Sequence, residues 1–463
     1  MSSTGLGLAW QVLTVEGPRA FRDRLRDRWA ARTRQRSFQQ VAIDKRDREP
    51  AAMAPLAQVP VLNVLSTPPR PDLGGVQVQL LRRLAAEERH RPWALLTPAG
   101  EGYRLEICST RGRQSVALMA ALPSPEQLEC PDFEWAVRAA AARVGATCIH
   151  FEQLVGWPLV SVSGLMSEGF RLVVSVHDFG LFCLRPHLLE RPMMKFCDFS
   201  GDADRCTRCL RCDWAVESDF QARRRAVARQ LLAAAAAVVY PSDFLRRSYR
   251  ELIPGLEPAG QHVVEPATRG EALASPEPRV RRGSHQQFHG AYVGSVKPHK
   301  GASEFEQLVK RLQDAPVRWT VFGGGDAEML RRLRRLPNVH IRGYYRADEL
   351  PAMLAASGVD LALLLSTWPE SYALTFDECL RAGVPALAFD HGAIGDRLRR
   401  CGGGALIPPG AGVDGVERIV RKVLERSPGD DAVLTQIAED LDLPDGQSAS
   451  EAMRAIYREL GIS

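Results

Sequence analysis

A strand–loop–helix–strand pattern late in the chain constrains the fold more than any other feature of the sequence. Residues 359–365 are a short apolar run, which predicts a buried strand of a parallel sheet. Pro369 ends the strand side, because proline can neither extend a ladder nor enter a helix interior. Residues 373–381 have a helical pattern with Ser371 as the expected N-cap, and residues 386–389 are the next apolar run. This alternation indicates an α/β fold with a parallel sheet.

Glu370 and Glu378 place two carboxylates around the start of that helix. Glu370 lies in a strand-to-helix loop at the carboxyl end of a strand, where open α/β sheets bind ligands. The helix N-terminus offers N–H groups and a partial positive charge, which suit a phosphate. Glu378 is at most ~12 Å from Glu370 if the span is helical. The pair could therefore hold hydroxyls at both ends of a nucleotide sugar; the alternative is two solvated carboxylates on an ordinary helix.

The segment PESYALTFDECLRAGVP, residues 369–385, resembles the signature of retaining glycosyltransferase family 4. The two glutamates separated by seven residues, the flanking proline and the Ala-Gly-Val-Pro end carry the resemblance. It covers residues 60–440, more strongly in the second half, and is similar to bacterial cell-surface polysaccharide glycosyltransferases. It implies the GT-B fold, in which two Rossmann-like α/β domains face each other across a cleft. The first domain would bind the acceptor and the second the nucleotide-sugar donor.

Length and composition fit this expectation. A chain of 463 residues can form two to three domains, and 45% hydrophobic with 25% charged residues is ordinary for a globular protein. The net charge of +5 is compatible with anionic substrates or a membrane surface. No run of 18 apolar residues predicts a membrane span, and the first residues lack a signal pattern. We therefore expect a cytoplasmic protein, at most peripheral at the inner face of a membrane.

Shifts in composition divide the chain into five expected parts. They are a basic N-terminal extension (1–57), an acceptor domain (58–267) with a Cys-rich insertion (183–212), a Pro-, Gly-, Ser- and Arg-rich linker (268–287), a donor domain (288–447), and a C-terminal helix returning to the first domain (448–463). Within the extension, residues 19–36 hold eight arginines against two aspartates. Phe21, Leu25 and Trp29 would form one narrow apolar stripe on a helix. This helix packs either on its own protein or on an anionic membrane; no aromatic-interleaved motif supports nucleic acid.

Lysines follow the first strand of the second domain. Lys297 and Lys300 come after residues 290–294, and lysines facing a diphosphate would neutralise charge as the leaving group departs. The resemblance matches Lys300 and the following glycine, whereas Ser295 stands where many family members have an arginine. Lys297 could substitute from another direction. The alternative for both is a solvated surface lysine.

Glycines mark further loops in which the backbone could approach a nucleotide. Gly74 and Gly75 lie between an expected strand and helix of the first domain, and Gly323 and Gly324 follow a strand of the second. Gly343 lies where the resemblance implies that the base is read through backbone groups. A plain strand-to-helix turn is the alternative for each.

The resemblance also implies roles for the Glu370 stretch. Glu370 would hold donor-sugar hydroxyls and Glu378 the ribose, while a lysine and a short backbone segment would hold the diphosphate. That segment is Ala373, Leu374 and Thr375.

His177 and Asp178 directly follow the apolar run 171–176. A histidine at a strand end beside a cleft can hydrogen-bond a sugar hydroxyl. In the resembled family such a pair often contacts the donor sugar, so the resemblance makes His177, with Glu370 and Lys300, a candidate catalytic residue. The alternative is a structural histidine that caps the following loop.

Four cysteines at short spacing suggest a metal site. Cys197, Cys206, Cys209 and Cys212 include a Cys-x2-Cys-x2-Cys motif, and four thiolates suit tetrahedral Zn²⁺. An iron–sulfur cluster and a set of free thiols are the alternatives. The segment is similar to a Cys-rich insertion in a bacterial polysaccharide subgroup of the family. Any zinc would be structural, and no metal or other cofactor is expected in the chemistry itself.

The implied reaction moves a sugar from a nucleotide sugar to a hydroxyl of a carbohydrate or lipid-linked acceptor, with retention at the anomeric carbon. Two rivals remain. A nucleotide-sugar epimerase or hydrolase of the same fold would turn over donor without acceptor. A non-catalytic, metal-stabilised scaffold would bind its partner unchanged after loss of Glu370 and Glu378.

Overall fold

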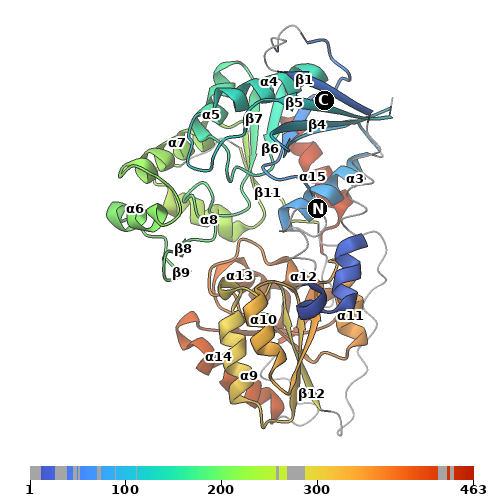
Figure 1. Cartoon of the computed structure of the whole chain (residues 1–463), viewed down its shortest axis with the longest axis vertical. Coiled ribbons are helices and arrows are strands. Elements are labelled where there is room, and N and C mark those ends of the chain that lie inside the picture. Colours follow the sequence, from blue (N-terminus) through green and yellow to red (C-terminus); the bar gives the residue numbers. More distant parts are fainter. Residues whose placement is uncertain are drawn as a thin grey trace. The chain divides into compact units, whose positions relative to one another are not determined.

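The computed structural model describes most of the chain. The described residues are 12–26, 39–44, 50, 53–69, 75–88, 90–110, 112–256, 260–267, 287–425, 435–437 and 443–462. They form two compact units (Figure 1). The C-terminal unit comprises residues 1–29 and 268–443, and the N-terminal unit comprises residues 30–267 and 444–463.

The C-terminal unit is built on a seven-stranded sheet in its described part, in the order β14-β13-β12-β15-β16-β17-β18. The strands are β12 (Phe288–Val293), β13 (Val317–Phe322), β14 (Val339–Gly343), β15 (Leu361–Leu364), β16 (Ala386–Phe389), β17 (Gly402–Ile407) and β18 (Thr435–Ile437). All neighbours pair in parallel except β17 and β18. The order reverses between β12 and β15, which makes their carboxyl ends the topological switch point.

Helices cover both faces of this sheet, because successive residues of a strand point to opposite sides. On one face, Tyr292 packs with apolar residues of α9 (Ala302–Arg311), α10 (Ala327–Arg334) and α14 (Gly412–Leu424). On the other face, Ala291 and Val293 pack with α11 (Leu350–Ala356), α12 (Leu374–Arg381) and α13 (Gly392–Cys401). Two apolar cores therefore enclose the sheet, and the predicted α/β class with parallel strands is confirmed.

The N-terminal unit contains, among its described residues, a nine-stranded sheet in the order β1-β5-β4-β3-β2-β6-β7-β10-β11. The strands are β1 (Gln39–Asp44), β2 (Val61–Val64), β3 (Trp93–Ala99), β4 (Gly102–Ser109), β5 (Gly112–Met119), β6 (Cys148–Phe151), β7 (Arg171–Ser175), β10 (Ala237–Tyr240) and β11 (Gln261–Val263). In the part of the sheet with the order β3-β2-β6-β7-β10-β11, neighbouring strands pair in parallel. Strand β4 is antiparallel to both of its neighbours, β3 and β5.

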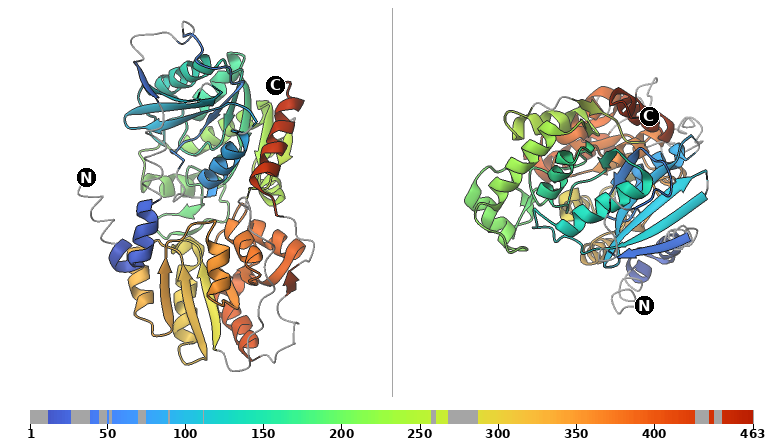
Figure 2. Two further views of the ribbon diagram at one scale, coloured as in Figure 1. Left: turned by 90° about the vertical axis from the view of Figure 1, so that its right-hand side faces the viewer. Right: turned by 90° about the horizontal axis from the view of Figure 1, so that it is seen from above.

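The helices of this unit are α3 (Gly75–Glu87), α4 (Pro131–Val144), α5 (Leu159–Ser167), α6 (Ala203–Arg211), α7 (Phe220–Ala234), α8 (Asp243–Leu252) and α15 (Gly446–Glu459). The C-terminal helix α15 packs on α3, and Met453, Ile456 and Tyr457 join a core with strands β2 and β7 (Figure 2). Its chain therefore returns to the N-terminal unit after the C-terminal unit ends.

The N-terminal 57 residues do not form one separate extension. Residues 12–26 belong to the C-terminal unit, where Val12, Val15 and Ala20 are buried. Strand β1 instead pairs in parallel with β5, at the edge of the other sheet. The expected linker, residues 268–286, and Trp29 of the apolar stripe lie outside the described residues. No helix of the described chain is long and apolar enough to cross a membrane.

Candidate active site

A cation and a carboxylate meet at the switch point of the C-terminal sheet. Lys300 ends the loop after β12, and Glu370 lies in the loop after β15. The Lys300 Nζ atom lies 2.7 Å from Glu370 Oε2, and the two side chains are 27% and 14% exposed. Glu370 also accepts a hydrogen bond from the Ser366 hydroxyl. The structure therefore brings together two residues that the sequence predicted for one site.

The loop that carries Lys300 depends on a glycine and a tyrosine. Gly301 has φ +75°, and a Cβ there would overlap the carbonyl of Leu365 next to β15. The Tyr292 hydroxyl lies 2.9 Å from the carbonyl oxygens of both Ser295 and Lys300. Lys297 is exposed, in keeping with the alternative of a surface lysine.

The Glu370 loop is held by the start of α13. The Glu370 carbonyl accepts a hydrogen bond from Ala393 N at 2.8 Å, and His391 Nε2 lies 2.7 Å from the Ser366 carbonyl. Gly392 has φ +67°, and a Cβ there would lie 2.6 Å from Glu370 N. Glycine is thus required where the two loops approach each other.

The start of α12 differs from the predicted one. The helix begins at Leu374, and its N-cap is Ala373 with φ +69°, not Ser371. Arg397 of α13 stabilises this left-handed residue, because its Nη1 donates to the carbonyls of Tyr372 and Ala373 at 3.1 and 3.3 Å. Its Nη2 forms a buried ion pair with Asp377. The N–H groups of Leu374 and Thr375 therefore lie in the first turn of α12, and Arg397 holds the backbone just before that turn.

Glu378 lies one turn into α12 and is 6% exposed. Burial, and next the negative charge of Glu378, raise the pKa of Tyr345 well above its usual value. The alternative of two solvated carboxylates is therefore wrong, since both glutamates are largely buried.

Residues 12–26 lie against two of the predicted glycines of this unit, Gly324 and Gly343. Gly323 has φ +152°, and a Cβ there would overlap Gly294 O, while a Cβ at Gly324 would lie 2.5 Å from Glu16 Oε2. Gly343 has φ +76°, and its Cβ would lie 2.7 Å from Glu16 O. All three glycines thus stand at close approaches of protein backbone or side chain.

Glu16 holds residues 12–26 against these loops, a contact that the sequence analysis missed. Its carboxylate accepts a hydrogen bond from Tyr344 N at 3.0 Å and pairs with Arg24 at 3.2 Å. The Arg24 guanidinium lies 4.5 Å from the centre of the Tyr344 ring. No residue pattern around Glu16 distinguishes it, because its partner lies more than 300 positions away.

In the N-terminal unit, His177 follows β7 and is partly buried. Burial, and next the positive charge of Arg83, lower its pKa to about 4, so its imidazole is neutral at pH 7. Asp178 is engaged within its own loop: it accepts from Gly180 N at 2.7 Å and from Gln153 Nε2 at 3.3 Å. Gly75 opens α3, and Gly74 lies outside the described residues.

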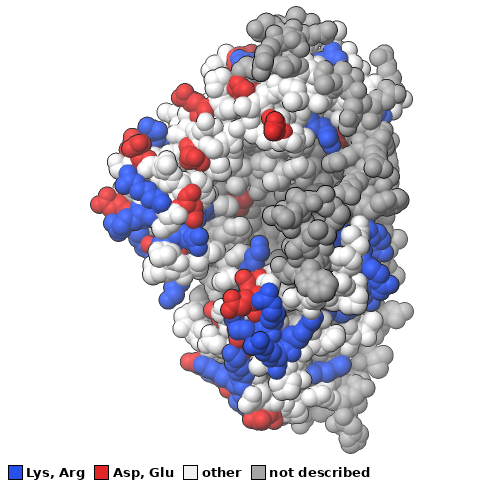
Figure 3. All heavy atoms as spheres, in the orientation of Figure 1, with Lys and Arg blue, Asp and Glu red and all other residues white. Residues whose placement is uncertain are grey.

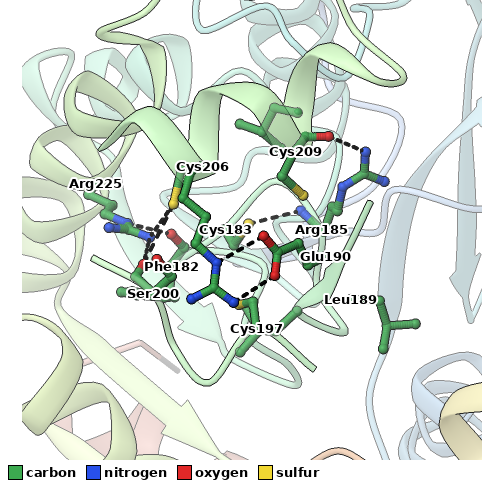
Figure 4. Close-up of a pocket in the computed structure, with 13 residues that line it drawn as sticks. Phe182, Cys183, Arg185, Leu189, Glu190, Cys197, Ser200, Cys206, Cys209 and Arg225 are labelled. Atoms are coloured by element: carbon green, nitrogen blue, oxygen red, sulfur yellow. Dashed lines mark hydrogen bonds and ion pairs between the residues drawn. The ribbon is translucent and has the colours of Figure 1, made fainter. Parts of the chain in front are cut away.

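The Cys-rich segment forms a small cavity between α6, α7 and the β8–β9 hairpin (Leu189–Glu190, Lys195–Phe196). Cys183, Cys197, Cys206 and Cys209 line it (Figure 4). Cys212 is exposed at the C-cap of α6 and its thiol donates to Arg208 O at 3.4 Å. Among the described residues, no three His, Cys, Asp or Glu side chains lie close enough together to hold a metal ion.

The two α/β units have the architecture of GT-B glycosyltransferase structures. Residues 281–439 match the family model described as "Glycosyl transferases group 1". No curated protein matches the chain.

Solved structures with the same fold cover most of the chain. Sucrose-phosphate synthase from Thermosynechococcus elongatus is 16% identical over 87% of this chain and 97% of its own, with a TM-score of 0.54. HepE from Anabaena, solved with UDP and glucose, is 16% identical over 86% and 98%, with a TM-score of 0.51. The catalytic domain of starch synthase IV from Arabidopsis thaliana, bound to ADP and acarbose, is 10% identical over 88% and 100%, with a TM-score of 0.50.

Proposed function

We propose that the protein is a retaining glycosyltransferase that moves a sugar from a nucleotide sugar to a hydroxyl of a carbohydrate or lipid-linked acceptor. One observation carries the proposal: Lys300 and Glu370 meet at the switch point of the C-terminal sheet. They lie in the region that matches the group 1 model. The neighbours solved with UDP or ADP support a nucleotide as part of the donor.

Each group at this site has a part in the proposed reaction. Lys300 and the backbone N–H groups of Leu374 and Thr375 offset the negative charge of the diphosphate as it leaves. Glu370 accepts hydrogen bonds from donor-sugar hydroxyls, and Glu378 from the ribose. His177, whose imidazole is neutral, stays a predicted ligand of the donor sugar.

The proposed chemistry needs no nucleophile from the protein. The bond between the anomeric carbon and the phosphate oxygen breaks, and the acceptor oxygen bonds to the same face of that carbon. The leaving phosphate oxygen takes the acceptor proton, so the products are a glycoside and a nucleoside diphosphate. No metal is needed in any of these steps.

The Lys300–Glu370 contact suggests how the site accommodates the donor. Without donor, the two side chains neutralise each other at 2.7 Å. A bound donor supplies its diphosphate to the lysine and its hydroxyls to the glutamate, so both partners are replaced. The pair therefore keeps the two charges in position and satisfied before binding.

We also propose a peripheral membrane contact, which would suit an acceptor of a bacterial cell-surface polysaccharide pathway. Arg19 and Arg22 of the helix at residues 18–26 are exposed, and Leu25 is 48% exposed. Lys and Arg also gather on the surface over α9 and α10 (Figure 3). Sedimentation with vesicles of anionic and of neutral lipid tests this contact; equal binding to both would contradict it.

The function is tested by release of nucleotide from UDP-, GDP- and ADP-sugars. The full chain is incubated with each donor, with and without an extract of lipid-linked saccharides, beside Glu370→Ala. A transferase releases one nucleotide quickly only when acceptor is present, and the variant loses that release. The configuration of the new glycosidic bond, read by NMR, then establishes retention.

Other outcomes would overturn the proposal. Fast release that acceptor does not change indicates a hydrolase, and a changed donor sugar without transfer indicates an epimerase. Absence of turnover with every donor and acceptor, in wild type as in the variant, favours a binding scaffold.

A further inference from the structure

The cavity of the Cys-rich segment is small and lined by sulfur. Two of its thiols, Cys206 and Cys209, stand one turn apart on α6 and so share a helix face. The other two come from separate loops: Cys183 follows β7, and Cys197 directly follows β9. The cavity measures about 20 Å³, which is room for one ion or water and not for a substrate.

Hydrogen-bond donors surround these sulfur atoms, as Figure 4 shows for several of them. Arg185 N donates to Cys183 Sγ at 3.4 Å, and Arg191 N donates to Cys209 Sγ at 3.3 Å. Arg225 Nη2 lies 3.8 Å from Cys206 Sγ. Backbone N–H groups and guanidinium groups both stabilise a thiolate over a thiol. Three of the four sulfur atoms thus each have a hydrogen-bond donor nearby.

The backbone around the cavity is unusual. Of the five non-glycine residues with left-handed φ in the described chain, four lie in this segment: Leu188, Met194, Asp198 and Phe199, with φ between 52° and 55°. Such conformations cost free energy and persist only where the surroundings impose them. The strands β8 and β9 have two residues each, so little sheet is present here to do so.

We propose that Cys183, Cys197, Cys206 and Cys209 bind one structural Zn²⁺, and that Cys212 does not take part. Four thiolates are the ligand set of closed structural zinc sites. Metal binding releases the thiol protons, because the thiolate is the form that ligates zinc. Binding also has to turn the sulfurs inward, because no three of them converge in the described structure. Cys212 is excluded because it lies at the end of α6 with an exposed thiol.

The site would stabilise the loop that begins at His177. Between His177 and Cys183 the chain is held by α7: Gln221 Nε2 donates to Phe182 O at 2.7 Å, and Arg224 donates to Leu181 O at 3.1 Å. A zinc bound at Cys183 would fix the other end of the same loop. The metal is therefore a stabiliser of structure, away from the reacting atoms, and its presence does not depend on the proposed transfer reaction.

The test measures metal in the full-length protein and in matched serine variants. Wild type is expected to purify with about one zinc per chain. Cys183→Ser is expected to lose most of it, whereas Cys212→Ser keeps the wild-type amount. The proposal is overturned if wild type holds no zinc after growth with zinc, or if Cys212→Ser loses zinc and Cys183→Ser keeps it.

A second measurement covers the case in which Cys183→Ser fails to fold. Zinc is exchanged for Co²⁺ in wild type and in Cys212→Ser, and the absorption spectra are compared. Both are expected to show the intense d–d bands of tetrahedral cobalt with sulfur-to-metal charge transfer. Loss of these bands in Cys212→Ser overturns the assignment, as does a brown iron–sulfur chromophore in protein that has received no cobalt.

Discussion

The ammonium group of Lys300 lies 2.7 Å from the carboxylate of Glu370, and the two residues follow the neighbouring parallel strands β12 and β15. This contact joins the two sides of the sheet at the position where the strand order reverses. It therefore places a cation and a carboxylate where α/β sheets bind ligands.

Lys300→Ala is expected to lower kcat/KM for donor turnover by about 10²–10³-fold, since removing one group that stabilises developing charge has that effect. Lys310→Ala is the matched control, because Lys310 is a lysine of the same unit that pairs with Glu306 on the surface of α9 at 2.8 Å. Steady-state nucleotide release measures both. Equal rates for the two variants would contradict the role of Lys300.

Arg397→Met is expected to destabilise the protein by about 3–5 kcal/mol, because Asp377 is fully buried and would lose its cation. The double variant Arg397→Met with Asp377→Leu should recover part of that loss, since no unpaired charge remains. Chemical denaturation followed by circular dichroism measures the free energy of unfolding.

Arg399→Ala serves as the control for Arg397. Its partner is Asp390, and both side chains of this pair are exposed to 55% and 32%. Exposed pairs contribute about 0–1 kcal/mol, so the control should unfold nearly as the wild type does. A loss as large as that of Arg397→Met would show that burial of the pair is not the cause.

Acid is expected to weaken the folded state through His177. The unfolded histidine takes up a proton near its ordinary pKa of 6.5, whereas the folded one does so only near 4. The unfolded state therefore binds more protons between these values, and stability falls as the pH falls from 6.5 to 4. Relative to His177→Asn, wild type should lose at most about 1.4 kcal/mol per pH unit in this window.

Denaturation of both proteins at pH 7 and pH 5 measures this difference. His340→Asn, in which an exposed histidine is replaced, is the control and should follow the wild type. A wild-type advantage over His177→Asn that does not change with pH would show that His177 titrates alike in both states.

Glu16→Ala is expected to release residues 12–26 from the C-terminal unit. The Glu16 side chain is 3% exposed, forms an ion pair with Arg24 and accepts a hydrogen bond from Tyr344 N. Its loss should cost about 1–3 kcal/mol, because Arg24 and the Tyr344 N–H lose an acceptor that they share. Trypsin should then cut at Arg22 and Arg24 faster than in Glu328→Ala, whose replaced side chain is 76% exposed. Equal cleavage of both variants would contradict this anchoring.

The sequence predicted the strands and loops of the C-terminal unit well because their residues are buried on both faces. Strands β15 and β16 are continuous apolar runs, and a short apolar run of this kind is typical of a strand buried on both faces of a parallel sheet. The Glu370 loop could be placed because it directly follows the β15 run and precedes α12. The predicted start of α12 was wrong because Arg397 stabilises the left-handed conformation of Ala373. Arg397 lies more than 20 residues further along the chain, so no local pattern reveals this contact.

Other features depended on contacts that no local pattern reveals. Strand β5 begins with Gly112, Arg113 and Gln114, which have no apolar pattern of a strand and pair with β4 in the structure. The Glu16 carboxylate accepts a hydrogen bond from the backbone N–H of Tyr344, which lies more than 300 positions away in the sequence. The regular spacing of Cys206, Cys209 and Cys212 predicted that Cys212 is a metal ligand. In the structure Cys212 is exposed at the end of α6, and Cys183 lines the cavity instead.

Donor binding tests the central claim most directly. Isothermal calorimetry with UDP-, GDP- and ADP-sugars would be run on wild type, on Glu370→Ala and on Glu328→Ala as the surface control. The account predicts that wild type binds one of these donors and that Glu370→Ala binds it at least about tenfold more weakly, equivalent to about 1.4 kcal/mol. Glu328→Ala should match the wild type. Binding of no donor, or equal binding by wild type and Glu370→Ala, would contradict the placement of the donor site.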